Sequence, residues 1–339
     1  MSAIQRVKQA IEDMRDGKMI IMCDDENREN EGDLVYPAEF STPEKVNFMA
    51  SEAKGLICVA LSKQIADRLN LSPMVTNNDS QHETAFTVSV DAKICTTGIS
   101  VKERDMTIRI LADSTSSANE LVRPGHIFPL IAKKGGVLAR TGHTEGSVDL
   151  CRLAGLEESS VICEIMKEDG SMARRDDLDI FCEKYNLNIV YISDIVEYRM
   201  QNESLVREIA ESKVKFLGAN SKRIDMVDHE GNHHIVYIFG EIKKESTVKF
   251  HNIMPDIELL SNSKKFNDIV NSIEYLKKNG GVLIFLNNDN FLKKEAKSYG
   301  IGAQIIKKLG IEKISLLTSS KGKEFIGLSG FGLDIIEEL

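Results

Sequence analysis

Strand-like apolar runs that alternate with helix-like segments constrain the fold of residues 1–200 more than any other feature of the chain. Residues 19–23, 56–61 and 161–166 are apolar almost throughout, and 2–16 place apolar residues at helical spacing. Strands of this kind are buried on both faces, so helices must cover the sheet that they form. We therefore expect an α/β (α+β) fold in which helices cover a mixed sheet.

The second half of the chain predicts a smaller α+β domain. A hairpin pattern surrounds 228–232, and a helix at 264–278 leads into an apolar strand at 282–286. The length of 339 residues also favours two domains over one. We place the domains at 1–202 and 210–339, joined by a helical or extended segment rather than a Gly/Ser-rich linker.

Finer elements follow from the same periodicities. They predict strands at 84–90, 127–132 and 137–139, and helices at 145–154 and 290–298. A helix should also begin after Ser100, with Glu103 completing a capping box. That capping box would occupy the Glu103 side chain at the start of its own helix.

Charge is distributed unevenly, which excludes some classes of partner. Residues 201–339 hold 20 Lys and Arg and 19 Asp and Glu, whereas residues 1–200 hold 23 and 33. A domain this acidic is a poor ligand for nucleic-acid phosphates, so we expect no nucleic-acid partner. The charge suits a metal site or a solvated surface.

Hydropathy and cysteine usage favour a cytoplasmic protein without membrane association. No apolar run approaches the roughly 18 residues that cross a bilayer, and residues 1–7 lack the apolar core of a secretion signal. All six cysteines lie between positions 23 and 182, and none forms a Cys-x-x-Cys pair. Buried free thiols in a reducing compartment explain this pattern without disulfides or zinc.

A candidate metal-binding segment follows the first apolar strand. Residues 24–33 (DDENRENEGD) contain six carboxylates and one arginine. Carboxylates this close repel one another, raise each other's pKa and favour a divalent cation. The alternative is an acidic turn that is simply solvated.

Residues 140–145 (RTGHTE) are a candidate phosphate cradle, because they lie between an apolar segment and a helix. A helix N-terminus offers unpaired backbone amides, to which Thr141 and Thr144 add hydroxyls and Arg140 adds a charged fork. The alternatives are that Thr144 is a plain N-cap and that His143 is a surface histidine.

Two further side chains are candidates for proton transfer. Glu164 lies within an apolar strand, where a carboxylate is costly unless it is paired, metal-bound or facing a cleft. His126 follows the rigid turn at 123–125. The alternatives are a buried salt bridge for Glu164 and a structural role for His126.

These motifs together resemble the 3,4-dihydroxy-2-butanone 4-phosphate synthase family. The resemblance covers residues 1–200 and rests on 24–33, 96–100, 123–130, 135–138, 140–145 and 163–164. It implies a lyase of riboflavin biosynthesis that converts D-ribulose 5-phosphate into L-3,4-dihydroxy-2-butanone 4-phosphate and formate. It also implies Mg²⁺ (or Mn²⁺) as the cofactor and a homodimer.

The resemblance also implies residue roles, with Glu29 and His143 as the metal ligands. The residues implied to contact the sugar phosphate are Arg28, Glu29, Asp33, Arg140, Thr141, Gly142, His143, Thr144 and Glu164. The catalytic roles fall to His126, Glu164, Glu31 and Asp33. Glu103 stands where the family often has Asp, so no role is assigned to it. One Glu and one His occupy only some of the six coordination positions of an octahedral cation, which leaves the others for water and substrate.

The second half resembles the end of GTP cyclohydrolase II, at 299–306, 309–311, 315–318 and 330–333. That family's three-cysteine zinc site is absent, because no cysteine follows Cys182. We therefore expect no zinc in this domain and no cyclohydrolase activity. One alternative is a bifunctional enzyme that also acts as a GTP cyclohydrolase II through a rebuilt site. The other is a regulatory module that binds a nucleotide or a partner.

Four histidines of the second half could in principle hold a metal in such a rebuilt site: His229, His233, His234 and His251. A cluster of histidines around a hairpin is more often a surface feature, and we expect these side chains at the surface.

Overall fold

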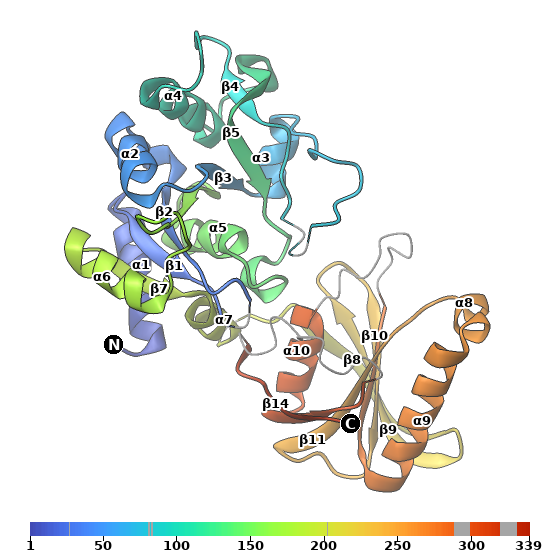
Figure 1. Cartoon of the computed structure of the whole chain (residues 1–339). Helices are drawn as coiled ribbons and strands as arrows, with labels where there is room; N and C mark the ends of the chain where they lie inside the picture. Colours follow the sequence, from blue (N-terminus) through green and yellow to red (C-terminus); the bar gives the residue numbers. More distant parts are fainter. Residues whose placement is uncertain (27, 81, 83, 202, 288–298, 319–330) are drawn as a thin grey trace. The chain divides into compact units, whose positions relative to one another are not determined.

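The computed structural model describes residues 1–26, 28–80, 82, 84–201, 203–287, 299–318 and 331–339. The chain divides into two compact units, Met1–Gln201 and Asn202–Leu339, and each unit has its own mixed sheet with helices against it (Figure 1). The expected α/β (α+β) fold class is therefore confirmed. No helix in the described ranges has the length and apolar character needed to cross a bilayer.

Seven strands form the sheet of the first unit, counted over its described residues. They are β1 (Ile20–Cys23), β2 (Gly32–Pro37), β3 (Cys58–Leu61), β4 (Val90–Ala92), β5 (Leu121–Ile131), β6 (Ser159–Glu164) and β7 (Asn188–Tyr191). Their order is β4-β5-β3-β6-β2-β1-β7, in which β3 pairs parallel with β5 and β1 with β7, while the other pairs are antiparallel.

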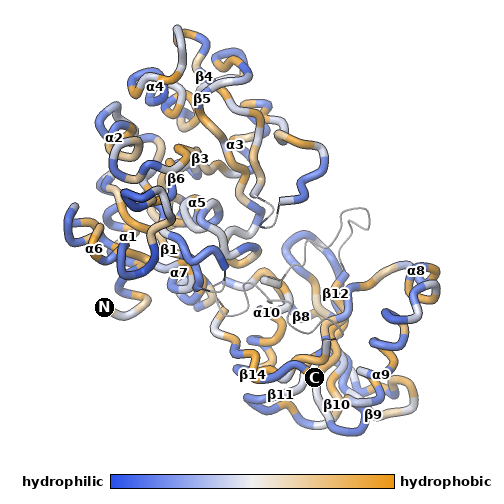
Figure 2. The backbone as a smooth tube through the Cα atoms, viewed as in Figure 1, coloured by the Kyte–Doolittle hydropathy of each residue, from blue (hydrophilic) through white to orange (hydrophobic). Residues whose placement is uncertain are grey.

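Helices cover both faces of this sheet. On one face lie α1 (Ala3–Arg15), α5 (His143–Ala154) and α7 (Ile192–Met200). On the other lie α2 (Pro43–Phe48), α3 (Lys63–Arg68), α4 (Val101–Ala112) and α6 (Arg175–Tyr185), which enclose the main apolar core. Figure 2 shows hydrophobic residues gathered where the central strands β3 and β6 run.

Alternation of side chains along the strands decides what faces α5. Leu34 and Tyr36 of β2 belong to the core under α2 to α4, so Asp33 points to the opposite face, toward α5. Asp33 is paired in register with Glu164 of β6. Helix α5 approaches this face closely, since a Cβ at Gly146 would lie 2.7 Å from the Met22 sulfur.

Four local predictions were wrong. Residues 84–89 are not a continuous strand but make isolated bridges, Phe86 with Leu130 and Thr87 with Pro73. Residues 137–139 do not form a strand, because Gly135 and Gly136 take positive φ (98° and 60°) and start the 3₁₀ turn Gly136–Leu138. Strand β5 begins at Leu121 rather than at 127, and α5 begins two residues before the predicted position.

The expected capping box at α4 is also absent. The Ser100 hydroxyl accepts the Glu103 backbone N–H, but the Glu103 carboxylate bonds to the preceding loop instead of to the Ser100 backbone N–H.

Short 3₁₀ or π turns cover Ala38–Phe40, Met49–Ala53 and Ala118–Glu120.

The second unit holds a mixed sheet of seven strands among its described residues, in the order β14-β13-β11-β12-β10-β9-β8. They are β8 (Val206–Phe216), β9 (Ala219–Asp228), β10 (His233–Phe239), β11 (Glu245–Asn252), β12 (Gly281–Leu286), β13 (Lys313–Leu316) and β14 (Asp334–Glu338). The predicted hairpin corresponds to β9 and β10, and β8 begins within the segment expected to join the domains.

Helices flank this second sheet as well. Helices α8 (Asp256–Ser261) and α9 (Ser263–Asn279) share a cluster with Phe239, Leu283 and Phe285. Helix α10 (Tyr299–Lys308) packs on the other face, where a Cβ at Gly302 would lie 2.8 Å from the Phe250 ring. The helix predicted at 290–298 lies outside the described residues.

Candidate metal and substrate site

The acidic loop between β1 and β2 is organised by Asp24. Its Oδ1 accepts the Glu31 N–H at 2.8 Å, and its Oδ2 accepts the Glu29 N–H at 2.9 Å. Arg28 Nη1 donates to Asp24 Oδ2 at 3.0 Å and to Glu29 Oε2 at 2.5 Å. One carboxylate and the one arginine thus fold the loop back on itself, so the loop is not a merely solvated turn.

A second arginine fixes this loop from outside. Arg174, just before α6, donates from Nη1 to the carbonyls of Glu29 and Asn30 at 2.6 and 2.5 Å. Asn30 has a φ of 54°, a conformation that asparagine tolerates better than most residues. The Glu29 side chain is therefore presented from a backbone that is held on both sides.

His143 brings the acidic loop and the sheet together. It is the first residue of α5 and is 7 % exposed, so it is not a surface histidine. Its Nδ1 lies 3.6 Å from Glu29 Oε2, and its Nε2 lies 3.9 Å from Asp33 Oδ1. These distances are too long for good hydrogen bonds but suit groups that share a third partner.

The charges of the three groups perturb one another strongly. Burial raises the pKa of Asp33 to about 7. Burial opposes ionisation of Glu29, but its contact with His143 and the charge of Arg28 outweigh this and lower its pKa to about 2. Burial also lowers the pKa of His143, but the charge of Asp33 and the contact with Glu29 outweigh it and raise that pKa to about 9. The carboxylates thus attract a positive charge to this point.

The donor set fits a hard divalent cation. Ligand atoms of Asp24, Glu29 and His143 all lie within 4.8 Å of one another. Asp33 Oδ1 and His143 Nε2 are buried and have no hydrogen-bond partner in the described part of the chain. Buried polar atoms without partners are costly, and a cation with its water ligands would satisfy such atoms. Carboxylate oxygens with one imidazole are ligands that Mg²⁺ and Mn²⁺ accept.

Glu164 and Glu31 border this cluster. Glu164 Oε2 accepts the Leu56 N–H at 2.9 Å, so this half-buried carboxylate bonds to backbone at the end of β6. Glu31 Oε1 lies 3.7 Å from Arg174 Nη1. Burial and the neighbouring charge of Glu29 raise the pKa of Glu31. Together with Asp33, these groups place three carboxylates around the same corner of the sheet.

The segment at 140–144 lies at the start of α5, as predicted, but Thr144 is not the cap. Gly142 is the N-cap and has no side chain, so no side chain caps the helix. Thr144 is buried in the first turn. Arg140 donates to Glu145 Oε2 at 2.6 Å and to the His82 carbonyl at 2.8 Å, which ties His82 to the site.

His126 lies at the same edge of the sheet as Glu164, but the contacts of the described residues link it to a different carboxylate. Its Nδ1 lies 2.8 Å from Asp91 Oδ2, and its N–H donates to Asp91 Oδ1 at 2.8 Å. The ring is 43 % exposed. A Cβ at Gly98 would lie 2.6 Å from His126 Nδ1, so the loop at 96–100 covers this pair closely.

Glu103 fixes that loop. Its carboxylate accepts hydrogen bonds from the backbone and hydroxyl of Thr96 and Thr97, from the Gly98 N–H and from the Ser100 hydroxyl. The hydrogen bonds with Thr96 in particular lower the pKa of Glu103 to about 2. Glu103 therefore serves the conformation of residues 96–100.

In the second unit, the prediction of surface histidines was wrong for His234. Its side chain is fully buried, with Nε2 3.3 Å from Asp228 Oδ2, while Nδ1 accepts the Asn287 N–H at 3.2 Å. His251 packs edge-on against Phe285. Both His234 nitrogens are thus bound to protein groups in this structure.

Sequence reasoning missed the organising residues of the site. Asp24 and Arg174 hold the acidic loop, Asp91 orients His126, and His82 lies with its Nδ1 3.9 Å from Glu29 Oε1. Only Asp24 lay within a segment that the sequence had singled out. His82 and Arg174 come from loops and Asp91 from the short strand β4, and the neighbours of all three are set by the tertiary fold.

Comparisons with known proteins agree with this architecture. The sequence profile of 3,4-dihydroxy-2-butanone 4-phosphate synthase matches residues 8–198, and that of GTP cyclohydrolase II matches 198–339. A 3,4-dihydroxy-2-butanone 4-phosphate synthase from Sulfurospirillum multivorans is 69% identical over 335 residues, covering 99% of this chain and 94% of the relative.

Two solved structures are also similar. RibBX of A. baumannii, described as a two-domain 3,4-dihydroxy-2-butanone 4-phosphate synthase, is 40% identical with a TM-score of 0.69 and covers 98% of this chain and 99% of its own. A synthase solved with two magnesium ions is 38% identical with a TM-score of 0.56, and covers 58% of this chain and 97% of its own.

Proposed function

Because the chain belongs to the 3,4-dihydroxy-2-butanone 4-phosphate synthase family and carries a GTP cyclohydrolase II-like second domain, we propose that the cluster around His143 is its active site. The enzyme is a lyase of riboflavin biosynthesis that converts D-ribulose 5-phosphate into L-3,4-dihydroxy-2-butanone 4-phosphate and formate. The observation that carries the assignment is the convergence of Glu29, Asp33 and His143, where two buried atoms lack hydrogen-bond partners among the described residues.

Glu29 and His143 would hold a divalent cation, Mg²⁺ or Mn²⁺, with Asp24 close enough to contribute. When bound, the cation supplies Lewis-acid polarisation of the ketose carbonyl. The magnesium-bearing relative supports this choice of metal. Both Asp24 carboxylate oxygens already accept hydrogen bonds from the loop backbone or from Arg28. Glu29 and His143 are therefore favoured as the principal metal ligands.

The remaining groups would bind the substrate and move its protons. The backbone at 141–144 and the Arg140 fork would receive the phosphate at the positive end of α5. Asp33 is buried and has a raised pKa, so it can hold a proton near neutral pH and suits acid–base exchange. Glu31 and Glu164 would serve the other proton transfers, since each lies beside Asp33 on the loop or the paired strand. His126 would take part through its exposed Nε2, with Nδ1 fixed by Asp91.

The proposal extends to the oligomeric state of the protein and to its location in the cell. We propose a cytoplasmic homodimer, in keeping with the resemblance and with six free cysteines, four of them buried. The substrate is a small sugar phosphate, and the acidic first domain does not suit nucleic acid.

A variant pair tests the metal assignment. Glu29→Gln and His143→Ala should each lower formate release from D-ribulose 5-phosphate at least about a hundredfold, because several kcal/mol of charge stabilisation depend on the cation. Bound Mn²⁺ measured by electron paramagnetic resonance should fall in parallel. The control is Glu26→Gln, which removes the same charge from an exposed position in the same loop. Near wild-type formate release by either variant would refute the assignment.

For the second domain we propose that GTP is not hydrolysed. No cysteine follows Cys182, so the thiolate ligands of a zinc-activated water are missing. Incubation with GTP and added Zn²⁺ should yield no pyrimidine product above a protein-free blank. Detection of that product would favour the bifunctional enzyme instead. A shift of the unfolding temperature with GTP, without turnover, would identify a nucleotide-binding module.

A further inference from the structure

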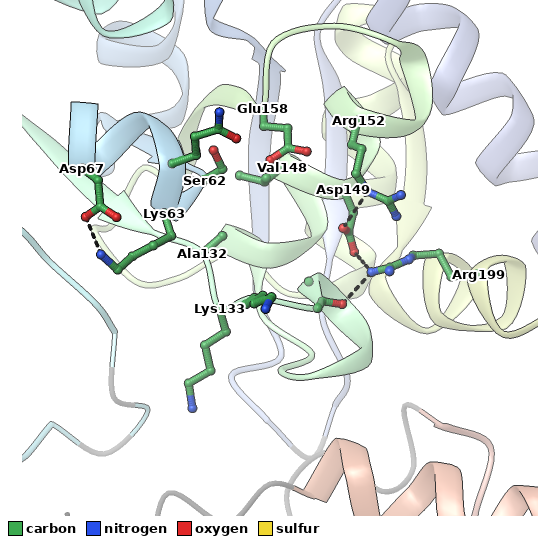
Figure 3. Close-up of a pocket in the computed structure, with 14 residues that line it drawn as sticks. Ser62, Lys63, Asp67, Ala132, Lys133, Val148, Asp149, Arg152, Glu158 and Arg199 are labelled. Atoms are coloured by element: carbon green, nitrogen blue, oxygen red, sulfur yellow. Dashed lines mark hydrogen bonds and ion pairs between the residues drawn. The ribbon is translucent and has the colours of Figure 1, made fainter. Parts of the chain in front are cut away.

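A pocket of about 590 Å³ lies at the opposite edge of the first sheet from Asp33 and Glu164. Strands β3 and β5 run parallel and end at Leu61 and Ile131, and the next residues, Ser62 and Ala132, line this pocket. In sheets covered by helices, ligands commonly bind outside the carboxyl ends of parallel strands. Figure 3 shows the side chains that line it.

The lining is cationic in a domain that is otherwise acidic. Five of its side chains are basic and three are acidic: Lys63, Lys133, Lys134, Arg152 and Arg199 against Asp67, Asp149 and Glu158. Residues 1–200 as a whole carry 23 basic and 33 acidic side chains, so the pocket reverses the sign of its domain. A local excess of positive charge concentrates anions.

The pocket has a fixed wall rather than a row of surface lysines. On one side Arg199 and Arg152 converge on Asp149 (Figure 3), at 2.6 and 3.8 Å. Arg199 and Asp149 are 4 % exposed each, and Arg199 also donates to the Gly135 carbonyl at 2.7 Å. Two guanidinium groups thus share one carboxylate, and burial raises the pKa of that carboxyl. On the other side Lys63 pairs with Asp67.

Size and charge together define a class of ligand. The volume falls within the range of small-molecule sites, and eight of the fourteen residues that line the pocket carry charged side chains. Arg and Lys at such a site are typical partners of phosphate oxygens. We propose that this pocket binds a small phosphate-bearing anion, separately from the site around His143.

The loop at 133–142 links the pocket to the catalytic site. Lys133 lines the pocket, and its N–H donates to Glu145 Oε1 at 3.0 Å. Glu145 Oε2 in turn accepts Arg140 at 2.6 Å. An anion that displaces residues 133–136 therefore acts on the carboxylate that positions Arg140.

The test uses inorganic pyrophosphate as the probe and the full-length, metal-free protein. Equilibrium dialysis measures the affinity for pyrophosphate, and variants of the pocket lining report on this site alone. Wild-type protein should bind pyrophosphate. The double variant Lys133→Glu with Lys134→Glu should bind it at least about tenfold more weakly, because two attractive charges become repulsive. The neutral pair Lys133→Gln with Lys134→Gln should fall between the two.

Lys8→Glu is the control, since it makes one substitution of the same kind at an exposed position of α1. It should bind pyrophosphate like the wild type, and equal unfolding temperatures of all variants would confirm that folding is intact. Two results would overturn the proposal. One is the absence of pyrophosphate binding by the wild type, and the other is unchanged binding by the double glutamate variant.

Discussion

At the scale of single residues, the acidic character of the first domain serves two separate purposes. Asp24, Asp91 and Glu103 accept hydrogen bonds from nearby backbone or from His126 and thereby fix loops. Glu29 and Asp33 instead face His143 at distances that leave room for a third partner. The number of carboxylates in a motif therefore overstates the number available for chemistry.

Glu103 provides a residue-scale prediction about pH. Its carboxylate accepts six hydrogen bonds from residues 96–100. These bonds, chiefly those from Thr96, lower the pKa of Glu103 from its ordinary value of 4.5 to about 2. A depressed pKa means that the ionised form is favoured by folding, so its contribution is complete above pH 4.5 and is lost as pH falls toward 2. Glu103→Gln should lower the unfolding temperature at neutral pH, and this difference should shrink below pH 4.5.

Thermal unfolding of the two proteins between pH 7 and pH 3.5 measures this effect. The matched control is Glu12→Gln, at an exposed site of α1, which leaves the 96–100 loop intact. A difference between Glu103→Gln and wild type that stays constant over the whole range would show that the carboxylate charge does not hold the loop.

At the scale of elements, helix α5 connects the two sites proposed in the first domain. Its first turn carries His143 and packs beside Asp33, while its second half carries Asp149 and Arg152 at the cationic pocket. The helix approaches β1 closely because Gly146 has no side chain. A displacement of α5 along its axis would therefore move His143 at one end and Asp149 and Arg152 at the other.

Gly142, the N-cap of α5, provides a prediction at this scale. A Cβ there would lie 2.2 Å from Arg140 Nη1 and 2.8 Å from Glu145 Oε2. Gly142→Ala should displace the end of the Arg140 side chain and break its charge-assisted bond to Glu145. We expect the KM for D-ribulose 5-phosphate to rise about tenfold or more. The unfolding temperature should also fall, because the buried Glu145 carboxylate loses its charged partner.

Steady-state formate release checks this expectation. Arg140→Lys should raise the KM similarly, because lysine cannot reproduce the fork that reaches both Glu145 and the His82 carbonyl. A normal KM in Gly142→Ala would mean that Arg140 does not position the phosphate.

At the scale of the whole molecule, the chain contains two units with separate sheets and separate apolar clusters. All residues proposed for the lyase reaction lie in the first unit. A chain that ends at Gln201 should therefore fold and release formate within a factor of about two of the full-length enzyme. Far-ultraviolet circular dichroism and the formate assay test this on the same sample.

The second unit then needs a different explanation from catalysis of the lyase step. A truncated chain that folds but loses most of its activity would show that the second domain supports the active site. Activity unchanged by truncation, with a response of the full chain to GTP, would support the regulatory alternative.

The sequence was sufficient for the fold class and for much of the site. Apolar strands such as 19–23 predicted a covered sheet, and the segments 24–33 and 140–145 held Glu29 and His143. These inferences succeed because burial and local periodicity are recorded residue by residue along the chain. The failures at 84–90 and 137–139 have a common cause. Turn geometry and bridges to distant strands outweighed the local alternation of polar and apolar residues.

What the sequence determined by itself was the inventory: an acidic loop, a cradle at a helix start, a carboxylate in an apolar strand, and a second half without cysteine. Only the tertiary structure decided which groups meet. The pairing of Asp33 with Glu164, the role of Asp24 in holding the acidic loop, and the cationic pocket beyond β3 and β5 all depend on strand register and helix packing. Those contacts join residues far apart in the chain, and no local pattern specifies them.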